Sequence, residues 1–448
     1  MTMTENKIRG VNLGNWLVLE KWMEPEMFRG TDAEDETWLR RLLPREELGR
    51  RLTEHRDSWI TEKDFRWLSK QGVNLVRIPV PWFLFGDRGS HESCTEYLDR
   101  AFLWAERTGI RILIDLHTTP GNQNGYDNGG LIGVCRWHRD PEEVEYVLTV
   151  LTRLGERYGK EKQLFGIEVL NEPVSWIVYR TSPTTGRGRD PEEAKGSGFV
   201  PLRFLRKFYK EAYRRLREVM PEEKAVVFHD GFRLNSWNRF FKKSGMKNVY
   251  LDTHKYIWAM EMFLPVHKPF VYRLFLKYSE WQIRRVQKAV PVLVGEWCIC
   301  TRHAAFFRNH RYEGQGTDIF GTRLKELSEL SESLLEKAEK HRGVRKELEE
   351  KEAEAVLNVE KSVENFLEKR REALRKKQQA RYRDVAEAEL AAWDSAAGWI
   401  YWSYKLCGNR RIPSGESWKY GWDFRRCIKR GWLKEESNAE GIDNHPGL

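Results

Sequence analysis

The chain has 448 residues, 40% of them hydrophobic, which is enough for one large barrel with insertions or for two domains. Its formal net charge of +10 would suit an acidic partner, but Lys and Arg are interleaved with 67 acidic residues and no nucleic-acid-binding motif occurs, so we expect no nucleic-acid partner. No apolar run reaches the length of about 18 residues that a membrane-spanning helix needs.

The first residues of the chain and its cysteines indicate the cellular compartment in which the protein is expected. Residues Met1–Lys7 contain no apolar segment of the kind found in a secretion signal. The six cysteines are scattered through the chain, and only Cys298 and Cys300 lie close together, without a partner cluster for a metal. Cysteines in a chain without an export signal are expected to be reduced, so we predict a cytoplasmic location.

Strand-like runs alternate with helical patterns along most of the chain. Helical patterns cover Thr61–Lys70, Thr95–Thr108, Pro141–Tyr158 and Leu202–Val219. The alternation predicts an α/β fold, a (β/α)₈ TIM barrel. An open doubly wound sheet is the alternative, but no G-x-G-x-x-G motif follows any of the strands. The eight strand-like runs are Ile8–Leu13, Asn74–Pro79, Arg111–Leu116, Phe165–Leu170, Ala225–His229, Val249–Asp252, Val292–Gly295 and Trp399–Trp402.

Three of the segments that follow strands are long. They cover residues 14–53, 118–140 and 174–201, after the first, third and fourth strands. In a barrel all of them lie on the face that carries the C-terminal ends of the strands. Extended loops on that face are typical of a site that surrounds a specific ligand.

Residues 321–392 differ in composition from the rest of the chain. Apolar residues there recur at spacings of three, four and seven, and a turn at Gly343 would produce an antiparallel helical hairpin. We therefore predict a catalytic barrel made of residues 1–320 and 393–448, with 321–392 as a charged helical insertion between the seventh and eighth strands. The insertion is either a solvated arm, or a homo-oligomerisation surface or a wall beside the site.

Two strand-like runs are followed by a glutamate. Glu172 follows Phe165–Leu170 and Asn171, and Glu296 follows Val292–Gly295. Acids on strands four and seven of a barrel can face each other across its mouth. Such a pair breaks glycosidic bonds when one carboxyl protonates the leaving oxygen and the other faces the anomeric carbon. We predict Glu172 and Glu296 as the catalytic pair, a chemistry that needs no metal or organic cofactor.

Two residues have a predicted role next to this pair. Arg77 lies inside an apolar strand, where a charge needs a partner. The nucleophilic carboxylate of Glu296 is a sensible one, although a structural ion pair with another acid is the alternative. Asn171 precedes Glu172, so its amide can donate to the sugar hydroxyl beside the reacting carbon.

Aromatic and imidazole groups follow other strands. His117, His254 and Tyr256 occupy such positions, and Trp402 can form the apolar platform under the reacting sugar. Ordinary hydrogen-bonded histidines and a core tryptophan are the alternatives. A zinc site from His117 and His254 would need further ligands, and none stands out. Since the two glutamates need opposite protonation at one pH, we expect a raised pKa for Glu172 and a lowered pKa for Glu296.

These residues resemble glycoside hydrolase family 5 in clan A, with the greatest likeness to its exo-β-1,3-glucanase group. The match covers most of the chain outside residues 321–380. Two segments, Leu116–Asn128 and Arg311–Gly314, are specific to the glucanase group. The family markers are Arg9–Glu20, the strand with Arg77, Asn171–Pro173, His254 with Tyr256, Gly295–Trp297 and Trp399–Lys405.

The resemblance implies a retaining mechanism with Glu172 as acid/base and Glu296 as nucleophile. It also implies that Glu20 and Asn128 hold the hydroxyls of the terminal glucose, that Tyr126 clamps the leaving sugar and that Trp402 lies under the −1 sugar. The remaining positions that it places around the reacting centre are Arg77, His117, Asn171, His254 and Tyr256.

The expected activity is removal of β-linked glucose from the non-reducing end of β-glucans, oligosaccharides or β-glucosides. The extracellular fungal members of the group carry a secretion signal and disulfides, and the helical insertion is foreign to them. The substrates considered are therefore imported oligosaccharides and aryl or lipid β-glucosides. The alternatives are an endo-acting β-glucanase, mannanase or glycosylceramidase, and a non-catalytic carbohydrate-binding scaffold that works through 321–392.

Overall fold

The computed structural model describes residues 7–89, 91–181, 187–263, 268–305, 346–408, 410, 412 and 414–434. Eight parallel strands form a closed barrel in chain order, and β1 closes it by pairing with both β2 and β8. The predicted (β/α)₈ barrel is confirmed. The strands are β1 (Ile8–Asn12), β2 (Leu75–Val80), β3 (Arg111–Leu116), β4 (Leu164–Glu168), β5 (Ala225–His229), β6 (Val249–His254), β7 (Val292–Trp297) and β8 (Gly398–Tyr401).

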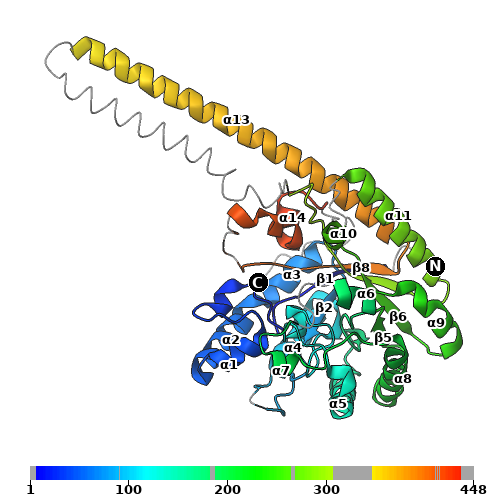
Figure 1. Cartoon of the computed structure of the whole chain (residues 1–448). Coiled ribbons are helices and arrows are strands. Elements are labelled where there is room, and N and C mark those ends of the chain that lie inside the picture. The colour runs from blue at the N-terminus through cyan, green and yellow to red at the C-terminus, as the bar shows by residue number, and fades with distance from the viewer. Residues whose placement is uncertain are drawn as a thin grey trace, which may run out of the picture.

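Helices surround the barrel (Figure 1). The α-helices are α1 (Glu36–Leu42), α2 (Arg45–Trp59), α3 (Glu62–Lys70), α4 (Thr95–Thr108), α5 (Pro141–Tyr158), α6 (Trp176–Thr181), α7 (Pro191–Ala194), α8 (Leu202–Val219), α9 (Asn238–Ser244), α10 (Ile257–Phe263), α11 (Pro269–Val286), α13 (Lys346–Trp393) and α14 (Phe424–Lys429). Short 3₁₀ helices are η1 (Pro25–Phe28), η2 (Asp127–Gly129), η3 (Trp137–Arg139), η4 (Leu234–Trp237) and η6 (Ser414–Trp422).

The helix boundaries follow local sequence signals. The Asp140 carboxylate caps α5 by accepting from the backbone N–H groups of Glu142 and Glu143, with Pro141 as the first helical residue. Helix α4 ends at Gly109, which has a φ of 73° that a residue with a side chain rarely adopts. Both helices lie where the periodicity of the sequence predicts them, and these signals set their ends.

The inside of the barrel is apolar at one end and charged at the other. Leu75 and Leu113 belong to a buried apolar cluster formed by residues within the first three positions of the strands. Arg77 and Asp115 follow two positions later on the same strands. Alternate residues of a strand point to the same side, so these charged groups form the next layer inside the barrel. The barrel thus supports a polar layer on an apolar base.

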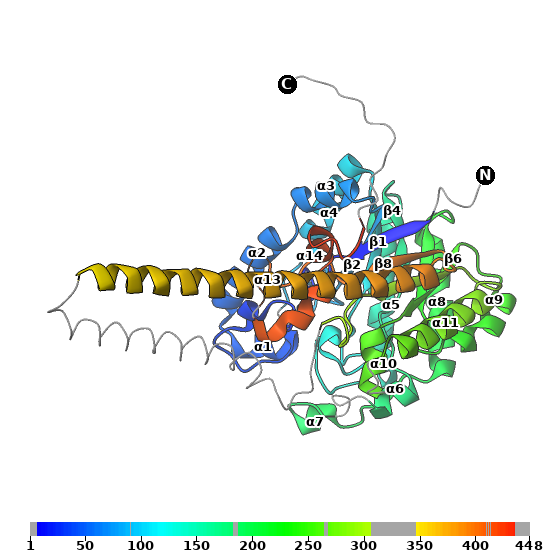
Figure 2. The same cartoon turned by 90° about the horizontal axis from the view of Figure 1, so that it is seen from above.

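Helix α13 is 48 residues long and has two different environments (Figures 1 and 2). Its C-terminal part lies along the barrel, where Tyr382 and Trp393 are fully buried. Its N-terminal part projects away from the barrel, and Leu357 and Phe366 are exposed there. The predicted turn at Gly343, the first helix of the predicted hairpin and the segment 311–314 lie outside the described residues, so the division into barrel and insertion stays a prediction.

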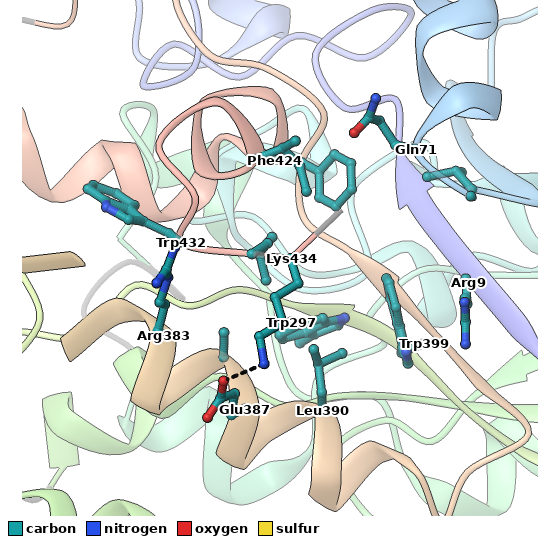
Figure 3. A pocket seen from close by; sticks show the side chains of 15 residues that line it. Arg9, Gln71, Trp297, Arg383, Glu387, Leu390, Trp399, Phe424, Trp432 and Lys434 are labelled. Carbon is teal, nitrogen blue, oxygen red and sulfur yellow. Dashed lines mark ion pairs between the residues drawn. The ribbon is translucent and has the colours of Figure 1, made fainter. Parts of the chain in front are cut away.

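A cavity of about 270 Å³ lies on the outside of the barrel between α13 and α14 (Figure 3). Trp297 and Trp399 line it from the strands, and an ion pair of 3.0 Å between the Lys434 ammonium and the Glu387 carboxylate lies beside them. It is distinct from the barrel mouth.

Among the described residues, no helix combines the length and the apolar character needed to cross a bilayer.

Candidate active site

The two predicted catalytic glutamates meet at the barrel mouth, joined by one imidazole. Nδ1 of His254 lies 2.7 Å from Oε1 of Glu172 and 3.3 Å from Oε2 of Glu296. These two carboxylate oxygens are therefore at most about 6.0 Å apart. A retaining glycosidase has its carboxyl groups about 5–5.5 Å apart, whereas an inverting enzyme needs about 6.5–9.5 Å. The geometry fits the retaining class.

Glu172 reaches this position through its backbone conformation. Strand β4 ends at Glu168, so Glu172 lies four residues beyond the strand and not directly at its end. Its φ of 45° is in the left-handed region, which costs a residue with a side chain on the order of 1 kcal/mol or more. The backbone N–H of Asn171 donates to the carbonyl of Leu116 at 3.0 Å, which fixes the preceding residue against the neighbouring strand end.

Glu296 reaches the barrel interior because β7 is irregular. Leu293 belongs to the inner apolar cluster, so strict alternation would direct Gly295 inward and Glu296 outward. The pairing of β7 with β8 shifts register between Val294 and Trp297, and such a bulge re-aims a side chain. As a result Glu296 points into the mouth, and Trp297 lines the outer cavity.

Arg77 contacts several acids at once and is completely buried. Its Nη1 donates to Oε1 of Glu296 at 3.0 Å, as predicted. Its Nε also donates to Oε2 of Glu168 at 2.7 Å, and its Nη2 lies 3.1 Å from Oδ2 of Asp115. Nη2 further donates to the side-chain oxygen of Asn171 at 2.8 Å. Both alternatives for Arg77 therefore hold: it pairs with the predicted nucleophile and with structural acids.

The protonation of the pair differs from the sequence expectation. Burial opposes ionisation of Glu172, but the hydrogen bond and positive charge of His254 outweigh it and lower the Glu172 pKa to about 2. Burial raises the pKa of Glu296, against the opposing charges of His254 and Arg77. The predicted directions, raised for Glu172 and lowered for Glu296, are wrong for the site without substrate. The physical reason is that the shared imidazole makes its shorter contact with Glu172.

The proton of this site is on His254. Burial favours the neutral imidazole, but the carboxylates of Glu296 and Asp252 outweigh it and raise the His254 pKa well above its usual value. Nε2 of His254 lies 3.3 Å from Oδ2 of Asp252. Gly295 makes room for that acid, since a Cβ there would lie 2.0 Å from Asp252 Oδ2. Glu172 thus has a proton one hydrogen bond away.

The remaining predicted residues surround the pair at different distances. The Tyr256 hydroxyl donates to Oε2 of Glu296 at 2.7 Å, and Asn128 Nδ2 donates to Oε2 of Glu172 at 2.9 Å. His117 hydrogen-bonds Asp115 and stacks on Trp402, with ring centroids 5.7 Å apart and planes at 7°.

Like Asn128, Glu20 and Tyr126 were predicted from the resemblance alone, and these two residues have different surroundings. Glu20 is buried and accepts from the Trp22 indole N–H at 2.8 Å. Burial and the charge of Asp127 raise its pKa well above the usual value, with smaller contributions from Glu296 and Glu172. Tyr126 is half-buried and immediately precedes η2, the turn that carries Asn128.

Sequence reasoning missed the acids beneath the site and an aromatic wall beside it. Glu168, Asp115 and Asp252 are fully buried charged residues within strands. The argument that singled out Arg77, a charge inside an apolar strand, would have found them. The wall has no such signal, because its members come from distant segments: Trp258 stacks on Trp418 at 5.4 Å, and Trp422 lies 5.0 Å from Tyr256.

Two groups of donors in the described residues are close enough to hold a cation. They are Glu172, His229 and His254, and Glu168, Asp252 and His254, each with ligand atoms within 4.8 Å of one another. Both include the protonated His254, and Glu168 is already paired with Arg77. A metal ion would have to displace the His254 proton, so these donors fit a proton-holding network better than a metal centre.

Known proteins resemble this chain in sequence and in fold. A family model described as Cellulase (glycosyl hydrolase family 5) matches residues 47–315. A glucan 1,3-beta-glucosidase of Blumeria graminis is 31% identical over 98% of this chain and 90% of that protein. A probable glucan 1,3-beta-glucosidase A of Emericella nidulans is 28% identical over 95% of this chain and 89% of that protein. The crystal structure of a rutinosidase from Aspergillus niger shares the fold, with a TM-score of 0.64 and 20% identity over 96% of this chain and 99% of that one.

Proposed function

The chain belongs to glycosyl hydrolase family 5, and from this premise we propose that it removes β-linked glucose from the non-reducing end of β-glucans, oligosaccharides or β-glucosides with retention of configuration. The relatives named glucan 1,3-beta-glucosidase support the substrate class. One observation carries the mechanism: His254 contacts carboxylate oxygens of Glu172 and Glu296 that are at most about 6.0 Å apart.

The reaction proceeds in two displacements. The Glu296 carboxylate attacks the anomeric carbon while Glu172 protonates the departing oxygen, so the glycosidic bond breaks and a glycosyl-enzyme ester forms. Glu172 then removes a proton from water, the hydroxide oxygen attacks the same carbon, and the ester bond to Glu296 breaks. Two inversions give net retention. The proton given to the leaving oxygen is replaced by the one taken from water, so the site regains its initial protonation.

The neighbouring groups support this cycle in defined ways. The hydrogen bonds from Arg77 and Tyr256 fix the orientation of the Glu296 carboxylate toward the anomeric carbon. His254 stores a proton 2.7 Å from Glu172 and supplies it as the leaving oxygen gains charge. The His117 and Trp402 rings are stacked with nearly parallel planes, and Trp402 provides an apolar surface for the C–H face of the sugar.

The test uses Glu172→Gln and Glu296→Gln, with Glu142→Gln as the matched control, because Glu142 is exposed in the first turn of α5. Hydrolysis of laminarin oligomers should fall by about 10³-fold or more in both variants. A nitrophenyl β-glucoside should be affected less by Glu172→Gln, because its leaving group needs little protonation. Full activity of either variant would overturn the assignment, and so would an α-anomer as the first product in proton NMR.

The product profile separates exo from endo action. Glucose as the sole early product from laminarin oligomers supports the exo-acting proposal. A mixture of longer oligosaccharides would replace it with an endo-acting β-glucanase, and no hydrolysis of any glycan would favour a carbohydrate-binding scaffold.

We also propose a reducing, cytoplasmic environment for the enzyme. The support is that all six cysteines are buried and unpaired. Localisation of the full-length chain in its native cells tests this, and detection in the secreted fraction would contradict it.

A further inference from the structure

Helix α11 carries a stripe of large apolar residues that face solvent. Phe270, Leu274, Tyr278 and Trp281 have exposed fractions of 68%, 51%, 55% and 49%. With 3.6 residues per turn, these positions fall within about 80° of the helix circumference. The core uses a different set of α11 residues. An exposed stripe of this size on a helix whose packing face is already occupied indicates a contact surface.

The other faces of α11 are accounted for. Tyr272, Leu276, Ile283 and Val286 are buried against the barrel. Helix α11 lies next to α13 (Figures 1 and 2), and it also contacts η4. The apolar stripe is therefore the outward face of the helix.

Cations accompany the stripe along its whole length. Arg273, Lys277 and Arg284 follow the same spacing as the apolar residues, on one flank of the stripe, and all three are exposed. Arg285 lies over the Trp281 ring at 5.3 Å. The helix contains a single acid, Glu280, and that acid pairs with Arg284 at 2.7 Å. Positive charge beside aromatic side chains is typical of helices that lie at the interface of an anionic lipid surface.

A second exposed apolar pair lies closer to the active site. Trp176 and Ile177 open α6, only four residues after Glu172, and their exposed fractions are 55% and 65%. No residue of α6 is buried. Both views place α6, α10 and α11 on the same flank of the barrel (Figures 1 and 2). The flank that carries the α11 stripe therefore also carries exposed apolar side chains of α6.

We propose that the α11 face, formed by Phe270, Leu274, Tyr278 and Trp281 with the flanking Arg273, Lys277 and Arg284, binds peripherally to an anionic lipid bilayer surface. The apolar side chains insert between headgroups, and the cations contact lipid phosphates and carboxylates. Tyr278 and Trp281 suit this interface, because each combines an apolar ring with a polar tip.

The charge pattern favours a lipid surface over a second copy of the chain. Two α11 faces in a symmetric dimer would bring their cation rows together, and the whole chain has a net charge of +10. An anionic surface instead neutralises the row. The proposal extends the proposed function but does not depend on it, because binding is measured without any glycoside.

The test is sedimentation of the full chain with sucrose-loaded vesicles of phosphatidylcholine, with and without phosphatidylserine. The wild-type chain should sediment with phosphatidylserine vesicles, and binding should weaken with added salt. The variant Phe270→Ser/Leu274→Ser/Trp281→Ser removes the apolar contribution. The variant Arg273→Glu/Lys277→Glu reverses two charges. Each should lower the partition coefficient by about tenfold or more.

Matched controls separate this effect from general damage. Leu103→Ser on α4 removes an apolar residue that is 54% exposed, and Lys63→Glu/Lys70→Glu reverses two exposed charges on α3. Both should bind vesicles like wild type. All variants should keep wild-type hydrolysis of nitrophenyl β-glucoside, which shows that they fold.

Three results would overturn the proposal. The first is no sedimentation of wild type with phosphatidylserine vesicles. The second is equal loss of binding in the control and α11 variants. The third is a wild-type dimer, seen by light scattering, that the α11 variants dissociate while vesicle binding is absent, which would assign the face to self-association.

Discussion

The barrel mouth and the projecting part of α13 use charged residues in opposite ways. In the mouth, Arg77 contacts three carboxylates in a fully buried position. On α13, Lys376 pairs with Glu372 at 2.7 Å, and both side chains are exposed. Both regions pair a basic side chain with acidic ones at similar distances. What differs is the removal of water, which makes the first cluster expensive to assemble and useful for chemistry.

The base of α13 is intermediate between these two regions. Glu389 is fully buried there, and neither of its side-chain oxygens has a hydrogen-bond partner among the described residues. Burial raises its pKa well above the usual value. The three regions therefore treat acidic groups differently. In the mouth, cations compensate the buried carboxylates. At Glu389 a bound proton removes the charge, and on the exposed part of α13 water solvates the carboxylate, so no compensation is needed.

The largest effect is expected from Arg77→Met. The change leaves Glu168, Asp115 and Glu296 buried without their cation, so the free energy of unfolding should fall by about 3–5 kcal/mol. The value of kcat/KM should fall as well, because the Glu296 carboxylate loses its orientation. Urea denaturation and steady-state kinetics measure both.

A double variant sharpens this result. Arg77→Met/Glu168→Gln removes one of the uncompensated acids, so it should recover part of the stability while activity stays low. Wild-type stability of the single variant would show that the buried ion pairs contribute little.

The next largest effect is expected from His254→Asn on the pH dependence of kcat/KM. In the wild type the basic limb follows loss of the His254 proton, whose pKa is raised by the surrounding carboxylates despite burial. Asparagine cannot hold that proton. Glu172 then loses the cation that lowers its pKa to about 2, so its own pKa rises and it becomes the proton carrier. A carboxyl releases its proton at lower pH than this imidazole, so the basic limb should move to lower pH.

The pH profile with nitrophenyl β-glucoside measures that shift. His91→Asn is the control and should leave the profile unchanged, because that imidazole stacks on Phe83 in the segment between β2 and α4. An unchanged basic limb in His254→Asn would show that another group holds the catalytic proton.

A smaller effect is expected from Glu389→Gln, and it concerns stability alone. In the unfolded chain this glutamate ionises near its ordinary pKa of 4.5, whereas in the folded chain it keeps its proton to higher pH. The wild type therefore loses stability as pH rises above about 4.5 until the raised folded-state pKa is reached. Glutamine removes this loss, so the Tm of the variant should exceed that of wild type in alkaline solution and the gain should vanish in acid.

Glu387→Gln is the matched control for this test. Glu387 lies on the same helix, in an ion pair with Lys434 near the surface. Its replacement should not produce the same pH-dependent gain. A Tm difference for Glu389→Gln that is constant across pH would mean that Glu389 does not keep its proton in the folded state.

The smallest effect is expected from Glu372→Ala, which breaks the exposed pair with Lys376. Exposed pairs on helices contribute little to stability. Neither the Tm nor hydrolysis of nitrophenyl β-glucoside should change beyond measurement error. A clear loss of either would show that the projecting part of α13 is engaged with the rest of the molecule.

Much of the fold could be predicted because its signals are local. Helix α5 begins at the capping residue Asp140 and helix α4 ends at Gly109, which are signals that the sequence displays, and the apolar strands stand out by composition. Both glutamates could be placed at the barrel mouth for the same reason. The protonation of the pair could not be predicted, because it depends on which carboxylate the His254 imidazole contacts more closely.

Local patterns were enough to predict the order of strands and helices, and with it the face on which Glu172 and Glu296 lie, because periodicity and capping act over a few residues. The folded chain was needed to see where the proton is held, how the bulge in β7 turns Glu296 inward, and which distant tryptophans form the aromatic wall. These features depend on burial and on contacts between segments far apart in the chain, and no local pattern carries that information.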